Sequence, residues 1–201
     1  MSTGETKVVI ATGNRGKLRE LAVLLGDLGM TLVAQSDLDI EPAKETGASF
    51  VENALQKARH ASAASGLPAI ADDSGIVVDA LDGRPGIHSA RYAGPGASDE
   101  DNVDRLLQEL DGISDRRAHF HCAAVFVARA DDPEPLIAEA RWHGEITTGK
   151  KGDGGFGYDP VFYVPECGCN SAELPADRKN QLSHRGKAFR ELASLLRQRT
   201  V

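Results

Sequence analysis

The six residues Thr12-Gly13-Asn14-Arg15-Gly16-Lys17 have the types and spacing of a phosphate-binding turn. The glycines let the backbone approach a ligand closely, and Lys17 adds a full positive charge. A helix that begins here would add unpaired N–H groups and the positive end of its dipole. The segment is not a Walker A loop, because two residues separate its glycines and Leu18 follows the lysine. The six residues alone are equally consistent with a glycine-bearing turn that carries a surface lysine.

A second group of candidate residues consists of the carboxylates Glu45, Asp72 and Asp73, which offer the hard oxygen ligands that magnesium prefers. We expect the aspartates directly after a strand at 68–71, where open α/β sheets present groups to ligands. Adjacent residues of an extended segment point to opposite faces, so one aspartate of the pair is expected to face a site. The structural alternative is an Asx-type turn before Gly75.

The hydrophobic pattern predicts an α/β protein in which these residues lie on the connections between strands and helices. An apolar run at 7–11 indicates a buried strand, and the leucines from Leu18 to Leu28 recur at helical spacing up to Gly29. Further strands are predicted at 31–34, 68–71, 76–80, 119–128 and 136–145, and further helices at 49–66, 98–112 and from Ser183 onward.

Two helix starts carry the sequence signature of a capping box. Ser49 stands three residues before Glu52, and Ser98 stands three residues before Asp101. For Glu52 we therefore favour a capping role over a direct role in chemistry.

Two other patterns resemble functional motifs but lack the required context. His119 and His121 share one face of a predicted strand, yet no third ligand stands at a recognisable spacing, so we favour a polar strand end over a metal site. Gly152, Gly154 and Gly157 match G-x-G-x-x-G, but a strand-like segment follows where a dinucleotide-binding fingerprint requires a helix.

Composition limits the classes of protein to be considered. The chain has 201 residues, a net charge of −7 and a pI of about 5.4, which argues against a nucleic-acid polymer as partner. Its three cysteines do not form a disulfide framework, and no long apolar run predicts a membrane span. We expect a single domain over residues 1–201 in a reduced, cytoplasmic protein without membrane or nucleic-acid partners.

Several motifs occur in one order along the chain and together resemble the inosine triphosphate pyrophosphatase family. After the turn at 12–17 they are E-T-G at 45–47, S-F-V-E-N-A-L-Q-K-A at 49–58, A-D-D-S-G at 71–75, P-G at 85–86, S-A-R-Y at 89–92, G-F-G-Y-D-P at 155–160 and S-H-R-G at 183–186. The resemblance covers nearly the whole chain. It implies an elongated mixed central β-sheet flanked by helices, two lobes with an active-site cleft between them, and a homodimer.

The resemblance also implies roles for individual residues toward a purine nucleoside triphosphate. Glu45 and Asp73 hold Mg²⁺, and Asp73 also acts as the base toward water. The implied triphosphate-binding residues are Thr12, Gly13, Asn14, Arg15, Gly16, Lys17 and Lys57. On the nucleoside, Phe156 and Tyr158 stack on the purine, Asp159, Lys179, His184 and Arg185 read its edge, and Ser74 and Gly157 complete the substrate contacts.

The expected reaction is hydrolysis of non-standard purine nucleoside triphosphates, dITP/ITP and dXTP/XTP, to the monophosphate and pyrophosphate. The chain departs from the family pattern at Cys169-Asn170-Ser171, where relatives more often carry a basic residue, a threonine and a larger apolar residue. A nucleotide-binding regulatory module is the alternative, but the retained Glu45 and Asp73 argue against it. Related pyrophosphatases for modified pyrimidine or 7-methyl-guanine nucleotides are disfavoured by the S-H-R segment.

Overall fold

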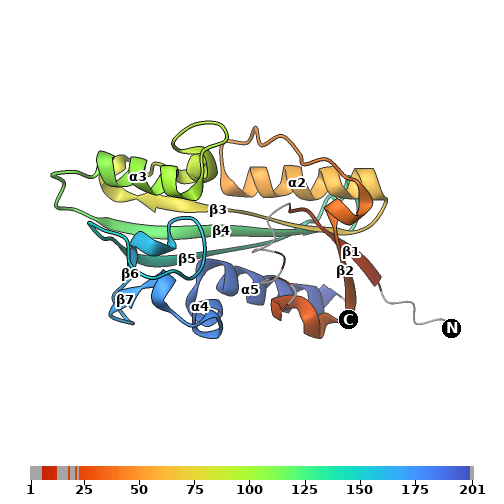
Figure 1. Ribbon diagram of the computed structural model, residues 1–201. Helices are drawn as coiled ribbons and strands as arrows, with labels where there is room; N and C mark the ends of the chain where they lie inside the picture. Colours follow the sequence, from red (N-terminus) through yellow and green to blue (C-terminus); the bar gives the residue numbers. More distant parts are fainter. Residues whose placement is uncertain (1–5, 13–17, 19–20, 22, 200–201) are drawn as a thin grey trace. The chain divides into compact units, whose positions relative to one another are not determined.

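The computed structural model of the protein describes residues 6–12, 18, 21 and 23–199. The described strands form one seven-stranded mixed sheet in the order β2-β1-β3-β4-β5-β6-β7 (Figure 1). The strands are β1 (Thr6–Ile10), β2 (Met30–Ala34), β3 (Ala69–Val78), β4 (Arg117–Val127), β5 (Leu136–Ile146), β6 (Phe162–Val164) and β7 (Cys169–Asn170). The helices are α2 (Phe50–Ser65), α3 (Asp99–Glu109), α4 (Ala176–Leu182) and α5 (His184–Arg199). The predicted class, a mixed α/β sheet flanked by helices, is confirmed.

The sheet combines parallel and antiparallel pairing. β1 pairs in parallel with both β2 and β3, whereas β6 pairs antiparallel with β5 and β7. β2 and β3 lie on either side of β1, and parallel strands need a crossover connection. The connection from β2 to β3 contains α2.

The chain divides into two compact units. Unit 1 comprises Met1–Asp73, Cys122–Ala140 and Arg185–Val201, and unit 2 comprises Ser74–His121 and Arg141–His184. The predicted cleft between two lobes and the assignment of residues 1–201 to a single domain stay predictions.

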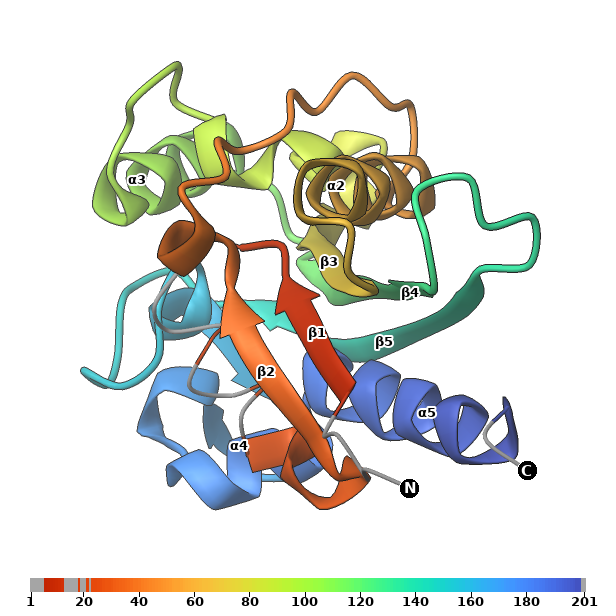
Figure 2. The same cartoon turned by 90° about the vertical axis from the view of Figure 1, so that its right-hand side faces the viewer.

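In unit 1, residues 8–10 of β1 and 69–71 of β3 are buried on both faces of the sheet, and successive residues alternate between two apolar clusters. Val8 and Ile10 pack in the cluster that contains Phe189 and Leu192 of α5. Val9 packs in the other cluster, which holds alanines of α2. Figures 1 and 2 both show α2 and α5 on opposite sides of these strands. This explains the continuous apolar runs in the sequence, because a strand covered on both faces has no polar side.

In unit 2 the core is rich in aromatic side chains. The Phe120 ring lies 4.6 Å from that of Phe162, and the Trp142 ring lies 5.3 Å from Phe162, measured between centroids. Leu106 and Leu110, from α3 and its C-terminal end, belong to the same cluster. The predicted alternation of β5 is also confirmed, since its outward residues are exposed while Trp142 is buried.

The helix ends follow the predicted capping chemistry. Ser49 Oγ accepts a hydrogen bond from Glu52 N at 3.2 Å, and the Glu52 carboxylate accepts one from Ala48 N at 2.6 Å. Ser98 and Asp101 form a complete capping box at the start of α3. The Glu52 carboxylate thus reaches back to the residue before the cap rather than to Ser49 N, so the predicted capping box is complete only at α3.

The prediction for residues 68–80 was wrong in one respect. The two short strands expected there are a single strand, β3, and Asp72-Asp73-Ser74-Gly75 lies inside it rather than in a loop after it. Both aspartates are buried against charged partners on neighbouring helices, so tertiary contacts override the turn propensity of this segment.

Smaller differences occur near the C-terminus and the first helix. The short helix α4 was not predicted, and α5 begins at His184 rather than at Ser183. Residues 19, 20 and 22 of the first predicted helix lie outside the described residues, whereas 18, 21 and 23–25 are helical and 26–28 form a 3-10 turn. The predicted end at Gly29 is confirmed by a left-handed backbone there, with φ of 63°. No helix within the described ranges is long and apolar enough to cross a membrane.

Candidate functional site

In unit 1, two predicted metal ligands converge on one lysine. The Lys57 ammonium donates to Asp73 Oδ1 at 2.8 Å and to Glu45 Oε1 at 3.0 Å. Lys57 comes from α2, Asp73 from the middle of β3, and Glu45 from the loop that precedes α2. The structure therefore brings together three residues that are separated in the sequence, with Glu45 and Asp73 standing 28 positions apart.

Asn53 holds this arrangement in place and was not singled out from the sequence. Its side chain is fully buried, and its Nδ2 donates to Asp73 Oδ2 at 3.2 Å. Its Oδ1 accepts from Gly47 N at 2.8 Å, which ties the loop that carries Glu45 to α2. A Cβ at position 47 would lie 2.6 Å from the Glu52 Cβ, so this close approach requires glycine. The available sequence signal was the position of Asn53 within the 49–58 motif.

The carboxylates around Lys57 determine its protonation state. Burial opposes the charge of the ammonium, but Asp73, followed by Asp72 and Glu45, outweighs burial and raises the pKa of Lys57 above 10.5. Lys57 is therefore a permanent cation at neutral pH. It occupies the point where the two carboxylates meet.

The same carboxylates fit a magnesium ion. Two carboxylate oxygens within hydrogen-bond distance of one ammonium can also reach one small cation. Among the described residues no group of three or more His, Cys, Asp or Glu side chains is arranged to hold a metal. Proteins commonly bind magnesium through one or two carboxylates, while water and substrate phosphates fill the remaining positions.

Asp72 points to the other face of the sheet from Asp73. Its Oδ2 lies 3.4 Å from Nε of Arg185, the second residue of α5, and both side chains are buried. The expectation that the two aspartates point to opposite faces is confirmed, because Asp73 contacts α2 and Asp72 contacts α5. The predicted role of Arg185 in reading a base stays a prediction.

The phosphate-binding turn is described only at its first residue. Thr12 is half-buried after β1, and its N–H donates to Ile10 O at 3.0 Å. Gly13, Asn14, Arg15, Gly16 and Lys17 lie outside the described residues, so their roles stay predictions.

In unit 2, Asp159 is the centre of a buried hydrogen-bond cluster. Its Oδ2 accepts from Lys179 Nζ at 2.5 Å and from Phe156 N at 2.8 Å, and its Oδ1 accepts from Ser171 Oγ at 2.6 Å. A Cβ at Gly155, where φ is 75°, would collide with the Asp159 carboxylate. The glycine-rich loop therefore wraps directly around this carboxylate. Ser171 was not assigned a role from the sequence.

Lys179 also contacts the aromatic residue predicted to stack on a base. Its Nζ lies 5.1 Å from the centroid of the Phe156 ring, within the range of a cation–π interaction. The Lys179 side chain is 10% exposed and Asp159 is 4% exposed, so the pair is almost fully desolvated. Predicted edge-reading and stacking residues thus lie next to each other.

The other predicted nucleoside-binding residues of unit 2 are held by its core. The Tyr158 hydroxyl donates to Ser89 O at 2.8 Å, and burial raises the pKa of that hydroxyl. The His184 ring stacks on Phe120 at 4.7 Å. Gly157 N donates to Asp99 Oδ2 at 2.7 Å, and Ser74 is half-buried in β3. Contacts of these residues with a substrate stay predictions.

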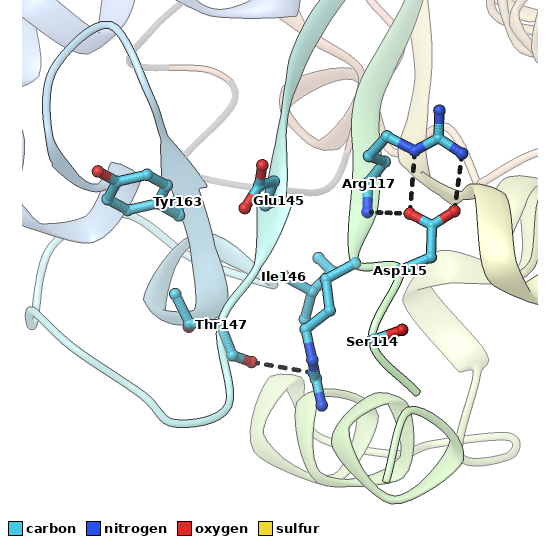
Figure 3. A pocket seen from close by; sticks show the side chains of 8 residues that line it. Ser114, Asp115, Arg117, Glu145, Ile146, Thr147 and Tyr163 are labelled. Atoms are coloured by element: carbon cyan, nitrogen blue, oxygen red, sulfur yellow. Dashed lines mark hydrogen bonds and ion pairs between the residues drawn. The ribbon is translucent and has the colours of Figure 1, made fainter. Parts of the chain in front are cut away.

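Unit 2 contains a hollow of about 300 Å³ that is lined by none of the predicted site residues. Figure 3 shows the side chains that line it. Arg117 donates twice to the Asp115 carboxylate there, at 2.9 and 2.7 Å, and holds the pKa of Asp115 at about 2. The second arginine that lines the hollow, Arg116, donates to Leu110 O at 2.9 Å and to Thr147 O at 3.4 Å, so both arginines have partners within the fold.

Histidines of β4 and β5 lie close to one another in unit 2. The His119 and His143 rings lie 5.3 Å apart between centroids. Burial, followed by the charge of Arg141 and by the neighbouring histidines, lowers the pKa of His119. A polar strand face agrees with these contacts.

Comparisons of sequence and of structure with known proteins identify the same family. Residues 8–195 match the model of the Ham1 family. The dITP/XTP pyrophosphatase of Methylococcus capsulatus is 60% identical over 193 residues, which cover 95% of this chain and 96% of that protein. The dITP/XTP pyrophosphatase of Photorhabdus laumondii is 54% identical, covering 95% and 98%. A solved HAM1 protein from Coxiella burnetii superposes with a TM-score of 0.91 at 44% identity, covering 96% of this chain and 99% of that one.

Proposed function

Because the chain belongs to the Ham1 family, we propose that it is a nucleoside triphosphate pyrophosphatase acting on non-standard purine nucleotides. The substrates are dITP/ITP and dXTP/XTP, and the products are the nucleoside monophosphate and pyrophosphate. Relatives more than 50% identical over nearly their whole length are named dITP/XTP pyrophosphatases, which supports this activity. The enzyme removes inosine and xanthosine nucleotides from the nucleotide pool.

The observation that carries the proposal is the meeting of Glu45, Asp73 and Lys57 in unit 1. Hydrolysis between the α- and β-phosphates needs a positioned water and a cationic surrounding for the leaving pyrophosphate. Lys57 supplies a fixed positive charge, because its pKa is raised by the surrounding carboxylates. In the substrate complex it binds the phosphates, together with Asn14 and Lys17 of the turn at 12–17.

Asp73 is the residue that acts on water. Its Oδ2 accepts from Asn53, which fixes the orientation of the carboxylate, and the carboxylate accepts the water proton as attack proceeds. Glu45 and Asp73 would hold Mg²⁺. Magnesium, when bound, neutralises negative charge that develops on the phosphates. No covalent enzyme intermediate is needed.

Base recognition falls to the cluster in unit 2. Phe156 and Tyr158 stack on the purine, and Lys179 and His184 donate to its O6 edge beside Asp159. Hypoxanthine and xanthine present an acceptor at O6 and a donor at N1, whereas adenine presents the reverse. Buried donors that face an amino group can cost about 10⁴ to 10⁵ in kcat/KM, so ATP is expected to be a very poor substrate.

The test is a product assay on a panel of ITP, XTP, their deoxy forms, GTP and ATP in the presence of magnesium. Pyrophosphate and phosphate are scored separately. We expect pyrophosphate from the inosine and xanthosine nucleotides, much less from GTP, and GTP at or above ATP. Release of phosphate alone would contradict the bond assignment. Tight nucleotide binding without turnover would favour the regulatory module.

Assembly and location are part of the same proposal. The enzyme is a homodimer in the cytoplasm and uses Mg²⁺. The support is the family membership and, for the ion, the two converging carboxylates.

A further inference from the structure

We propose that Ser171 is a positioning residue for base selectivity, which it controls through the carboxylate of Asp159. This inference rests on the proposed function, because it concerns the selection between purines by that same site. Ser171 does not touch the substrate. It fixes the carboxylate that in turn fixes Lys179 and Phe156.

The hydrogen bonds on Asp159 divide between its two oxygens. Oδ2 serves the recognition side, where it accepts from Lys179 Nζ and Phe156 N. Oδ1 accepts from Ser171 Oγ at 2.6 Å, a short bond as expected for a hydroxyl donating to a carboxylate. Ser171 therefore holds the end of the carboxylate opposite to the recognition side. Without this bond Oδ1 loses its side-chain donor, and the carboxylate can turn about its Cβ–Cγ bond around the contacts that Oδ2 still makes.

The backbone of Ser171 is itself held rigidly. Asn170 and Glu173 form a capping box around the 3-10 turn Ser171–Glu173, with Asn170 N donating to Glu173 Oε2 at 2.7 Å. Asn170 Nδ2 donates to Pro160 O at 2.7 Å, directly after Asp159. This segment is thus attached to the Asp159 turn at two independent points, one through Asn170 and one through Ser171.

Burial makes the loss of the Ser171 hydroxyl costly for the Asp159 carboxylate. Ser171 and Asp159 are both buried, so no water replaces a lost donor at low cost. The Lys179 ammonium makes its described hydrogen bond with Asp159 and lies against the Phe156 ring. A carboxylate that rotates therefore carries the ammonium away from the purine edge. The resulting loss of affinity concerns bases that need a donor at O6, such as hypoxanthine, and it is smaller for adenine.

The experiment compares Ser171→Ala with the unchanged protein on ITP and ATP in the presence of magnesium. We expect kcat/KM for ITP to fall about tenfold, the lower range for loss of a hydrogen bond to a charged group, while kcat/KM for ATP changes little. The ITP/ATP ratio therefore falls about tenfold. Calorimetry with inosine monophosphate should show a weaker affinity, while inorganic pyrophosphate binds as before.

The matched control is Ser65→Ala, in α2 of unit 1. Ser65 Oγ donates to Ala61 O at 2.7 Å and accepts from Leu67 N at 3.2 Å, so this variant also loses a serine hydroxyl with internal partners. It should lower the temperature of unfolding without changing the ITP/ATP ratio. An equal change of the ratio in both variants would overturn the proposal, because general destabilisation would then explain it.

A double-mutant cycle tests the route through Asp159. If Ser171 acts through that carboxylate, Ser171→Ala should have little further effect on the ratio in an Asp159→Asn background. Additive effects would overturn the inference. If the unchanged protein releases no pyrophosphate from any nucleotide, the proposed function fails. The binding of inosine monophosphate then still tests Ser171, because its unchanged affinity in Ser171→Ala would overturn the inference on its own.

Discussion

Replacing Asp73 by asparagine should separate the chemical step from substrate binding. The substitution keeps the size of the side chain but removes the negative charge of the carboxylate, which accepts from Lys57 Nζ at 2.8 Å. One carboxylate oxygen becomes an amide NH2 group, which donates. Loss of a preorganised electrostatic group of this kind costs about 10² to 10³ in kcat. Since Asp73 is proposed both to hold magnesium and to accept the water proton, we expect a loss of at least that size. Nucleotide affinity without magnesium should change little.

The same variant changes the titration of Lys57. Among the groups that raise the pKa of Lys57, Asp73 contributes most, so Asp73→Asn should lower that pKa. A raised folded-state pKa stabilises the protein at pH values below the ordinary 10.5, and this stabilisation is lost as the pH rises through the folded-state value. The alkaline loss of unfolding free energy should therefore be smaller in the variant.

The assays are steady-state kinetics on ITP with magnesium and urea unfolding as a function of pH. Asp132→Asn removes another buried carboxylate of unit 1, whose oxygens accept from Ala128 N and Glu134 N, and serves as the control for loss of a buried charge. Turnover close to that of the unchanged protein would refute the assignment of Asp73. If the unfolding free energy at alkaline pH falls as much in the variant as in the unchanged protein, the coupling of Asp73 to Lys57 is refuted.

Four further predictions concern other parts of the chain. Lys17→Ala should weaken binding of the triphosphate much more than of the monophosphate, and equal losses by calorimetry would return Lys17 to a surface-turn role. Ser49→Ala removes the cap of α2 and should lower the unfolding free energy by about 1 kcal/mol in urea titrations. Burial, together with the hydrogen bond to Glu109, raises the pKa of Tyr92 to about 12. Glu109→Gln should lower it in an ultraviolet titration. Light scattering at micromolar concentration should give the mass of a dimer, and a monomer mass would contradict the proposed assembly.

The parts of the fold that could be predicted are those determined by neighbouring residues. The caps at Ser49 and Ser98 involve partners three positions away, and the helix stop at Gly66 depends on one left-handed residue, with φ of 70°. The alternation of β5 also follows from local burial. Such features need no knowledge of the rest of the chain.

The parts that could not be predicted depend on distant partners. The segment around Asp72 and Asp73 has turn-like composition, and it extends as a strand because Lys57 and Arg185, on helices remote in sequence, neutralise its carboxylates. Asn53 donates to Asp73, 20 positions away, and Ser171 donates to Asp159, 12 positions away. Side-chain pairs at such separations leave no periodic signal.

The position of Asp72 and Asp73 inside one continuous strand also limits how the gene can change. Deleting a single codon between those for Ala69 and Asp72 would turn every later side chain of β3 to the opposite face. Asp73 would then point toward Arg185, and Ser74 would replace it opposite Lys57. Apolar residues of β3 can be exchanged for others of similar volume, but its length cannot change by one without removing the carboxylate site. Insertions and deletions in descendants of this sequence should therefore fall in its connecting loops and spare β3.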